Sequence, residues 1–100
     1  MHDYTGRIVQ ATAGRDKDGI FCVVGMDQEG RRLLLADGKR RKAASPKAKK
    51  LKHVLCLTDS QHGFDHPVVR SLRQGDPVSD RALRRALAAF KEEGITLGER

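Results

Sequence analysis

Residues 6–26 read GRIVQATAGRDKDGIFCVVGM, and this stretch decides the expected fold. Its first part, residues 7–12, is short and rich in β-branched side chains, whereas its last part, residues 20–26, is almost continuously apolar. The loop between these parts holds four charged residues between Gly14 and Gly19. Glycine lets the backbone turn tightly. The pattern predicts two β-strands joined by a charged loop, with Arg15 and Lys17 pointing outward.

Two more apolar segments continue the β-pattern. Residues 31–36 (RRLLLA) follow the turn sequence Gln28-Glu29-Gly30, in which Gly30 is free to take a positive φ. Asp37-Gly38 is a two-residue turn signal after this third strand. Residues 54–57 (VLCL) are expected to form the strand that closes a small antiparallel barrel.

The chain after the expected barrel is helical in pattern. Residues 58–66 read as a polar linker with Phe64 as a core candidate. Residues 67–74 (PVVRSLRQ) predict a short helix that Asp65 or His66 caps and that Gly75 ends.

A second, amphipathic helix is expected over residues 80–93. Ser79 is a suitable N-cap, Gly94 a suitable C-terminal stop, and residues 95–100 would form a frayed tail. One side holds Ala82, Leu83, Ala86, Leu87 and Phe90, and the other holds Arg81, Arg84, Arg85 and Lys91. The apolar side is expected to pack on the barrel or on the shorter helix, with docking on a partner as the alternative. The arginine side is ambiguous, since a solvated helix face also favours arginine.

A block of positive charge lies between the third and the closing strand. Residues 39–53 read KRRKAASPKAKKLKH and contain eight basic residues and no acid, whereas the rest of the chain is close to neutral. Such a block indicates a polyanionic partner, or else a solvated basic loop. Because strands flank it, we expect a tethered loop whose residues 43–50 are the most mobile internal segment of the free protein.

The order of these features resembles the KOW motif. In that motif a strand, a loop bearing glycine and lysine and a second strand begin an SH3-like barrel. Residues 6–26, ADGKRRK and PKAKKLKHV are similar to the KOW domains of large-subunit ribosomal proteins and of small ribosomal-protein-like RNA-binding proteins. Asp18 and Cys22 stand where many KOW motifs have glycine.

The resemblance implies a mainly β fold with α, in a single compact domain. Residues 1–57 would form a small SH3-like KOW β-barrel with the basic loop 39–53. The resemblance covers about the first 57 residues, and for residues 58–100 the residue pattern itself predicts a linker, a short helix and a C-terminal amphipathic helix packed on the barrel.

The resemblance also implies a non-enzymatic protein that binds structured RNA, either ribosomal RNA or the ribosome, in translation. Contacts with ribosomal proteins are also possible on this interpretation. Phosphates would be contacted by Lys39, Arg40, Arg41, Lys42, Lys47, Lys49, Lys50, Lys52 and His53, and by Arg15 and Lys17 of the first loop. For His53, capping the following strand is an equal alternative. The chain has no Trp and only four aromatic residues, which disfavours a stacking platform for single strands.

The alternative function is a KOW protein–protein interaction module of the transcription or translation machinery. In that case the apolar side of the helix over residues 80–93 would dock the partner.

Other classes find little support. Cys56, His62 and His66 have the spacing C-x5-H-x3-H, without a CxxC pair or a firm fourth ligand, so we expect no metal. Asp59, Asp65 and the same histidines read as cap and turn residues, so we expect no enzyme, cofactor or small-molecule substrate. Cys22 and Cys56 are expected to be buried free thiols in a cytoplasmic protein, because nothing marks the N-terminus for export and no apolar run could span a membrane.

Overall fold

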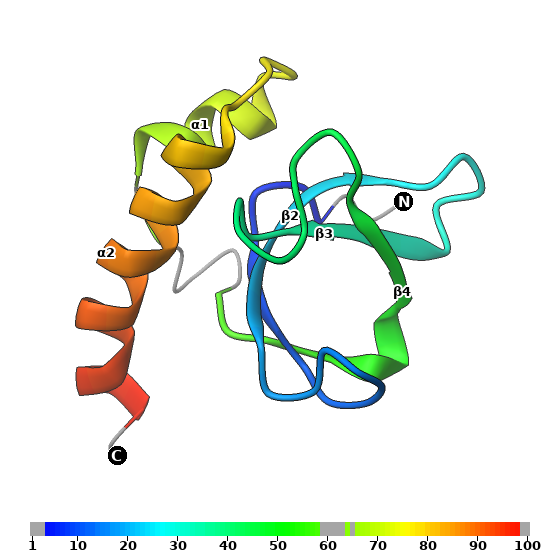
Figure 1. Ribbon diagram of the computed structural model, residues 1–100, viewed down its shortest axis with the longest axis horizontal. Helices are drawn as coiled ribbons and strands as arrows, with labels where there is room; N and C mark the ends of the chain where they lie inside the picture. The colour runs from blue at the N-terminus through cyan, green and yellow to red at the C-terminus, as the bar shows by residue number, and fades with distance from the viewer. Residues whose placement is uncertain (1–3, 59–63, 65, 99–100) are drawn as a thin grey trace.

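The computed structural model describes residues 4–58, 64 and 66–98, with side chains through residue 92. Five antiparallel strands form one sheet in the order β4-β3-β2-β1-β5, and two helices lie beside it (Figure 1). The strands are β1 (Ile8–Ala11), β2 (Ile20–Met26), β3 (Arg32–Ala36), β4 (Lys47–Lys50) and β5 (Val54–Cys56). A 3-10 turn, η1 (Leu51–His53), joins β4 to β5, and the helices are α1 (Pro67–Arg73) and α2 (Asp80–Gly98). The prediction of a small mixed β and α domain is confirmed.

Strand β2 is the centre of the sheet, and both of its faces are covered. Phe21 and Val23 are buried on one face, and Cys22 is buried on the other. A strand buried on both faces needs apolar residues throughout rather than in alternation. This explains the nearly continuous apolar run that predicted the strand.

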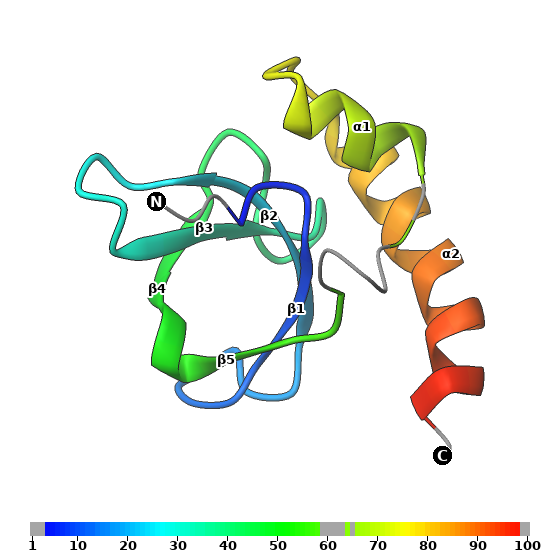
Figure 2. The ribbon, with the colours of Figure 1, turned by 180° about the vertical axis from the view of Figure 1, so that it is seen from behind.

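Strand β1 lies between β2 and β5. Val9 is the register partner of Phe21 on one side and of Cys56 on the other. Seen from behind, β5 runs from η1 back along β1 (Figure 2). The strand predicted over residues 54–57 therefore exists and pairs with the first strand, as β5 (Val54–Cys56).

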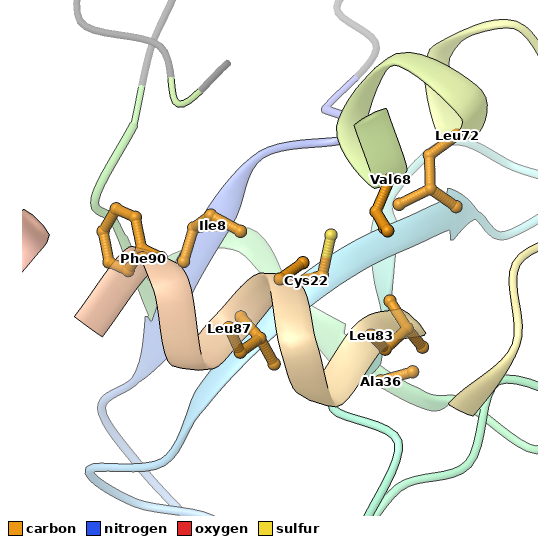
Figure 3. Packing of buried hydrophobic residues seen from close by; sticks show 9 residues of the cluster. Ile8, Cys22, Ala36, Val68, Leu72, Leu83, Leu87 and Phe90 are labelled. Atoms are coloured by element: carbon orange, nitrogen blue, oxygen red, sulfur yellow. The ribbon is translucent and has the colours of Figure 1, made fainter. Parts of the chain in front are cut away.

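Two apolar cores lie on opposite faces of the sheet. The core away from the helices consists of Val9, Ala11, Phe21, Val23, Leu33 and Leu35. The other lies between the sheet and the helices, where Ile8, Cys22 and Ala36 meet Leu83 and Leu87 (Figure 3). Residues alternate between the two cores along β1, because successive side chains of a strand point to opposite faces.

The amphipathic helix α2 covers one face of the sheet. Leu83, Ala86, Leu87 and Phe90 are buried, and Ala82 packs against them. The prediction that this apolar side packs within the chain is confirmed. The Ser79 Oγ accepts a hydrogen bond from the Ala82 N–H at 3.0 Å, which confirms the N-cap.

The predicted end of this helix was wrong. Helix α2 continues through Gly94 to Gly98, so the expected tail is helical over residues 95–98, and residues 99–100 lie outside the described residues. Glycine has no obligatory helix-ending conformation, and inside a helix it costs only about 0.5–1 kcal/mol relative to alanine.

The short helix α1 begins and ends as its sequence predicts. His66 is its N-cap, and its Nδ1 accepts from the Val68 N–H at 3.1 Å. Gly75 follows the helix with a φ of 85°. Val68 and Leu72 are buried in the core that the helices share with the sheet. The other proposed cap, Asp65, lies outside the described residues.

The expectation of one basic loop over residues 39–53 was wrong. Lys47–Lys50 forms β4, which pairs with β3, and Leu51–His53 forms η1. The sequence KAKK lacks the apolar alternation of a strand, so its strand conformation depends on pairing with the Leu-rich β3. Asp37-Gly38 likewise opens a loop of residues 37–46, not a two-residue hairpin.

The loop between β1 and β2 turns differently from the expectation. Gly14 has a φ of 82°, but the second left-handed residue is Asp18, with a φ of 71°, and not Gly19. Gly19 is required for space, because a Cβ there would lie 2.8 Å from the Phe21 ring. Asp16, between the exposed Arg15 and Lys17, is turned inward and buried.

Candidate nucleic-acid interface

The fold divides the basic residues of positions 39–53 among three elements. Lys39, Arg40 and Lys42 are exposed in the loop of residues 37–46. Lys47, Lys49 and Lys50 belong to β4, and Lys52 and His53 belong to η1. The predicted residues therefore do not form one continuous flexible loop.

The first part of the β3–β4 loop is closed upon itself. The backbone N–H groups of Asp37 and Gly38 both donate to the Arg41 carbonyl, at 2.9 and 3.0 Å. The Asp37 Oδ1 in turn accepts from the N–H groups of Lys39 and Arg41, each at 2.9 Å. These bonds hold residues 37–41 in a compact turn. The backbone that carries the exposed side chains of Lys39 and Arg40 is therefore held in one conformation.

Strand β4 distributes its lysines between the two faces of the sheet. Lys47 and Lys49 are register partners of Leu35 and Leu33, whose side chains belong to the core away from the helices. Lys50 is the register partner of Arg32. Since side chains alternate along a strand, Lys49 and Lys50 point to opposite faces.

Lys47 and Lys49 lie beside the β1–β2 loop in a small pocket, which we call the Asp16 pocket. Its volume is about 410 Å³. It is lined by Ala13, Gly14, Arg15, Asp16, Arg41, Lys47, Lys49 and His53. Five of the predicted RNA-contacting residues therefore meet here, from the β1–β2 loop, the β3–β4 loop, β4 and η1.

Asp16 forms an ion pair inside this pocket. The Arg41 Nη2 lies 2.9 Å from its Oδ2, and the Arg41 Nε lies 3.3 Å from its Oδ1. The hydrogen bond from Arg41 lowers the pKa of Asp16, and the charges of Arg41, Lys49 and Lys47 act in the same direction against the opposing effect of burial. Asp16 is thus a buried carboxylate that forms hydrogen bonds with Arg41 and attracts the charges of Lys49 and Lys47.

Lys49 is the least exposed cation of the predicted set. It is only 8% exposed, and its Nζ donates to the Ala13 carbonyl at 2.9 Å. The Nζ would also lie 3.3 Å from a Cβ at Gly14, which shows how closely the first loop approaches it. The hydrogen bonds of Lys49 and Arg41 therefore fix the β1–β2 loop in the pocket, whereas the side chains of Arg15 and Lys47 are exposed.

A second basic cluster lies at the β2–β3 turn. Arg31, Arg32, Lys50 and Lys52 line a pocket of about 400 Å³ together with Asp27 and Glu29. The Asp27 Oδ1 accepts from the N–H groups of Arg31 and Arg32. Desolvation raises the pKa of Asp27, but the hydrogen bonds from the backbone together outweigh it, so the pKa is lowered overall. The prediction included Lys50 and Lys52 but missed the two arginines. The two arginines could be assigned to this cluster only from the pairing of β3 with β4, which places Arg32 opposite Lys50 and which the sequence did not predict.

Lys17 lies in neither pocket. It is exposed in the β1–β2 loop. The exposed loop residues Lys39, Arg40 and Lys42 also lie outside both pockets.

The cysteines are not placed for a disulfide. Cys22 and Cys56 are free, and they pack against cores on opposite faces of the sheet. Burial raises the pKa of the Cys22 thiol to about 12. Cys56 is half-buried, in contrast to the expected full burial.

Of the residues considered for metal or acid–base chemistry, the structure describes Cys56 and His66. His66 is occupied as the cap of α1 and stacks on Phe64, with ring centroids 5.4 Å apart. Asp59, His62 and Asp65 lie outside the described residues. Among residues 4–58, 64 and 66–98, no three His, Cys, Asp or Glu side chains are grouped so as to hold a metal ion.

No family model matches the chain, and no curated protein matches it either. In the part of the chain that the structure describes, neither helix has the length and apolar character that crossing a membrane requires.

Proposed function

We propose that this chain is a non-enzymatic module that binds structured RNA, with ribosomal RNA or the ribosome as the partner. The convergence of Arg15, Arg41, Lys47, Lys49 and His53 in the Asp16 pocket supports the proposal most directly. These residues come from the β1–β2 loop, the β3–β4 loop, β4 and η1, so their grouping is a product of the fold and not only of local composition. Contacts to phosphates would position the RNA, with little reading of base sequence.

The arrangement of strands fits the finer proposal of an SH3-like KOW barrel. Strand β1 pairs with both β2 and β5, and η1 joins β4 to β5. On this proposal β4 and β5 are brought together at the ends of a strongly curved sheet. The Asp16 pocket would then lie at the KOW loop, and the protein would act in the cytoplasm.

The competing interaction-module hypothesis has lost its proposed docking face. Leu83, Leu87 and Phe90 are buried inside the chain and cannot also receive a partner without unfolding α2 from the sheet. Over residues 80–92 of α2, the exposed side chains are charged except for Ala88.

Co-sedimentation with ribosomes and titration of a structured RNA, each at several salt concentrations, test the proposal. Phosphate contacts release counterions, so about five contacts would give a slope of log K against log salt of about −4 to −5. The double variants Arg15→Glu/Lys47→Glu and Lys39→Glu/Arg40→Glu should each reduce the affinity at least tenfold and make the slope shallower. Lys91→Glu, on the exposed side of α2, serves as the charge control. Unchanged affinity and slope in both double variants would refute the proposal.

A further inference from the structure

We propose that Arg81, Arg84 and Arg85, at the start of α2, extend the basic β3–β4 loop into one surface that receives the phosphates of double-helical RNA. This inference rests on the proposed function and adds a second contact region to it. We call the six cations Lys39, Arg40, Lys42, Arg81, Arg84 and Arg85 the loop–helix surface. All six are exposed.

The loop is fixed against the helix by direct contacts. The Ala43 N–H donates to the Asp80 Oδ1 at 2.7 Å. The Arg84 Nη1 donates to the Gly38 carbonyl at 2.6 Å. Gly38 packs so closely against the Asp80 carbonyl that it has no room for a Cβ. Both views of the chain show the loop after β3 passing beside the helix pair (Figures 1 and 2). The loop and the first turns of α2 are therefore one unit.

The positive charge of α2 is concentrated at the end that contacts the loop. Arg81, Arg84 and Arg85 lie in its first two turns, whereas the exposed positions that follow through residue 92 are Ala88, Lys91 and Glu92, which together carry no net charge. Within the described residues, neither Arg81 nor Arg85 lies at ion-pairing distance from an acid. The neighbouring carboxylates of Asp37 and Asp80 are bound to backbone N–H groups.

This distribution is unfavourable for the isolated chain. The N-terminal turn of a helix favours negative charge because of the helix dipole, yet Arg81 lies in that turn next to Asp80. Six like charges on adjoining elements also repel one another. Local rules of this kind are broken mainly at functional sites, and a polyanion would remove both penalties.

The chemistry of the surface favours an RNA backbone. Guanidinium groups form paired hydrogen bonds with phosphate oxygens. Four of the six cations are arginines, three on α2 and one in the loop. The buried aromatic rings Phe21 and Phe90 belong to the two cores, so they offer no stacking platform on this surface. A rigid array of cations matches the regular phosphates of a double helix better than unpaired bases.

Binding of a short RNA duplex, measured by fluorescence anisotropy at several salt concentrations, tests the inference. Arg81→Glu and Arg85→Glu should each weaken binding about tenfold and reduce the salt slope by about 1. Arg84 is left unchanged because it holds the loop. Lys91→Glu is the matched control, since it makes the same charge change on the same helix two turns further on, and it should change the affinity less than about twofold. Glutamate near a helix N-terminus is favourable, so the arginine variants should fold, as circular dichroism would verify.

The outcomes separate this inference from the proposed function. If both arginine variants behave like Lys91→Glu while Lys39→Glu/Arg40→Glu loses affinity, the helix is not part of the surface and the RNA-binding proposal stands. If the loop variant and the pocket variants also bind normally, both ideas fail. Equal binding of poly-glutamate and the duplex would overturn the assignment to RNA. Selective loss in the two arginine variants, for the duplex alone, would support it.

Discussion

Arg41 reaches from the β3–β4 loop to Asp16 in the β1–β2 loop, and the two side chains form a two-point contact at 2.9 and 3.3 Å. The pair joins segments that are 25 residues apart in sequence. It also places a negative charge at the centre of a basic pocket. The contact organises the candidate RNA site and at the same time stabilises the fold.

Replacing Asp16 with asparagine should destabilise the protein. Asp16 is buried, and the change removes an ion pair and leaves Arg41 with a weaker acceptor. The expected loss is about 1–3 kcal/mol of unfolding free energy, measured by urea denaturation. Asp18→Asn is the matched control, because Asp18 is exposed and asparagine tolerates its positive φ. Equal stability of the two variants would show that the ion pair does not stabilise the fold.

The contribution of Asp16 to stability should depend on pH in a defined direction. Its pKa is lowered from 3.8 in the folded state, chiefly by the hydrogen bond from Arg41. The folded state therefore prefers the ionised form, and its stabilising effect is complete above the unfolded pKa and is lost as pH falls through the folded pKa. The difference in unfolding free energy between the native chain and Asp16→Asn should be constant near neutral pH. It should shrink below about pH 4. A difference that grows on acidification would contradict this.

Substitution of Gly38 by alanine should be far more damaging than the same change at Gly30. Both glycines have a positive φ, of 79° and 69°. A Cβ at Gly30 would meet nothing within 4 Å, whereas one at Gly38 would collide with the Asp80 carbonyl. We expect the unfolding free energy to fall by about 1 kcal/mol in Gly30→Ala and by about 2–4 kcal/mol in Gly38→Ala. Thermal unfolding of the two variants gives the comparison, and similar melting temperatures would exclude a close loop–helix contact.

Asp80→Ala distinguishes the effect of holding the basic loop in place from the effect of net charge on RNA affinity. The change removes the acceptor of the Ala43 N–H but makes the chain more positive. If the loop must be held for binding, affinity for structured RNA should fall severalfold, although general electrostatics predicts a rise. The exposed Asp76 provides the control, since Asp76→Ala adds the same charge without loosening the loop. Tighter binding by both variants would mean that the hold on the loop is irrelevant.

Leu83→Ala tests the packing of α2 on the sheet. Leu83 is fully buried in the core between the sheet and the helices, and Figure 3 shows it beside Ala36 of β3, so the change should lower the unfolding free energy by about 2–5 kcal/mol. Leu55→Ala removes the same atoms from a side chain that is 54% exposed, and should cost under about 1 kcal/mol. Chemical denaturation of both variants gives the difference. A small loss at Leu83 would show that the helix does not share the core.

The sequence predicted elements well where local pattern and burial agree. Strand β2 was recognised within its true bounds because a doubly covered strand must be apolar. The start of α2 was also predicted, because the Ser79 hydroxyl bonds a backbone N–H only three residues further on, so the signal is local in the sequence.

Features that depend on distant partners could not be predicted. Lys47–Lys50 shows no strand pattern of its own and becomes a strand through its register with β3. The inward turn of Asp16 depends on Arg41, which no local spacing indicates. Arg32 belongs to a basic cluster only because the register places it opposite Lys50. Gly94 was mistaken for a helix end because a glycine signals a stop only when the chain takes the left-handed conformation there.

The lysines of β4 have a consequence for self-association. Strand β4 is an outer member of the sheet order, and such strands can recruit a strand from another molecule. Lysine side chains, and above all a charged side chain turned inward like that of Lys49, make such recruitment costly. Replacing Lys47 and Lys49 with valine would therefore produce a β-branched, uncharged outer strand of the kind that starts aggregation. We therefore expect these two lysines to disfavour pairing of β4 with copies of the chain, whatever else they bind.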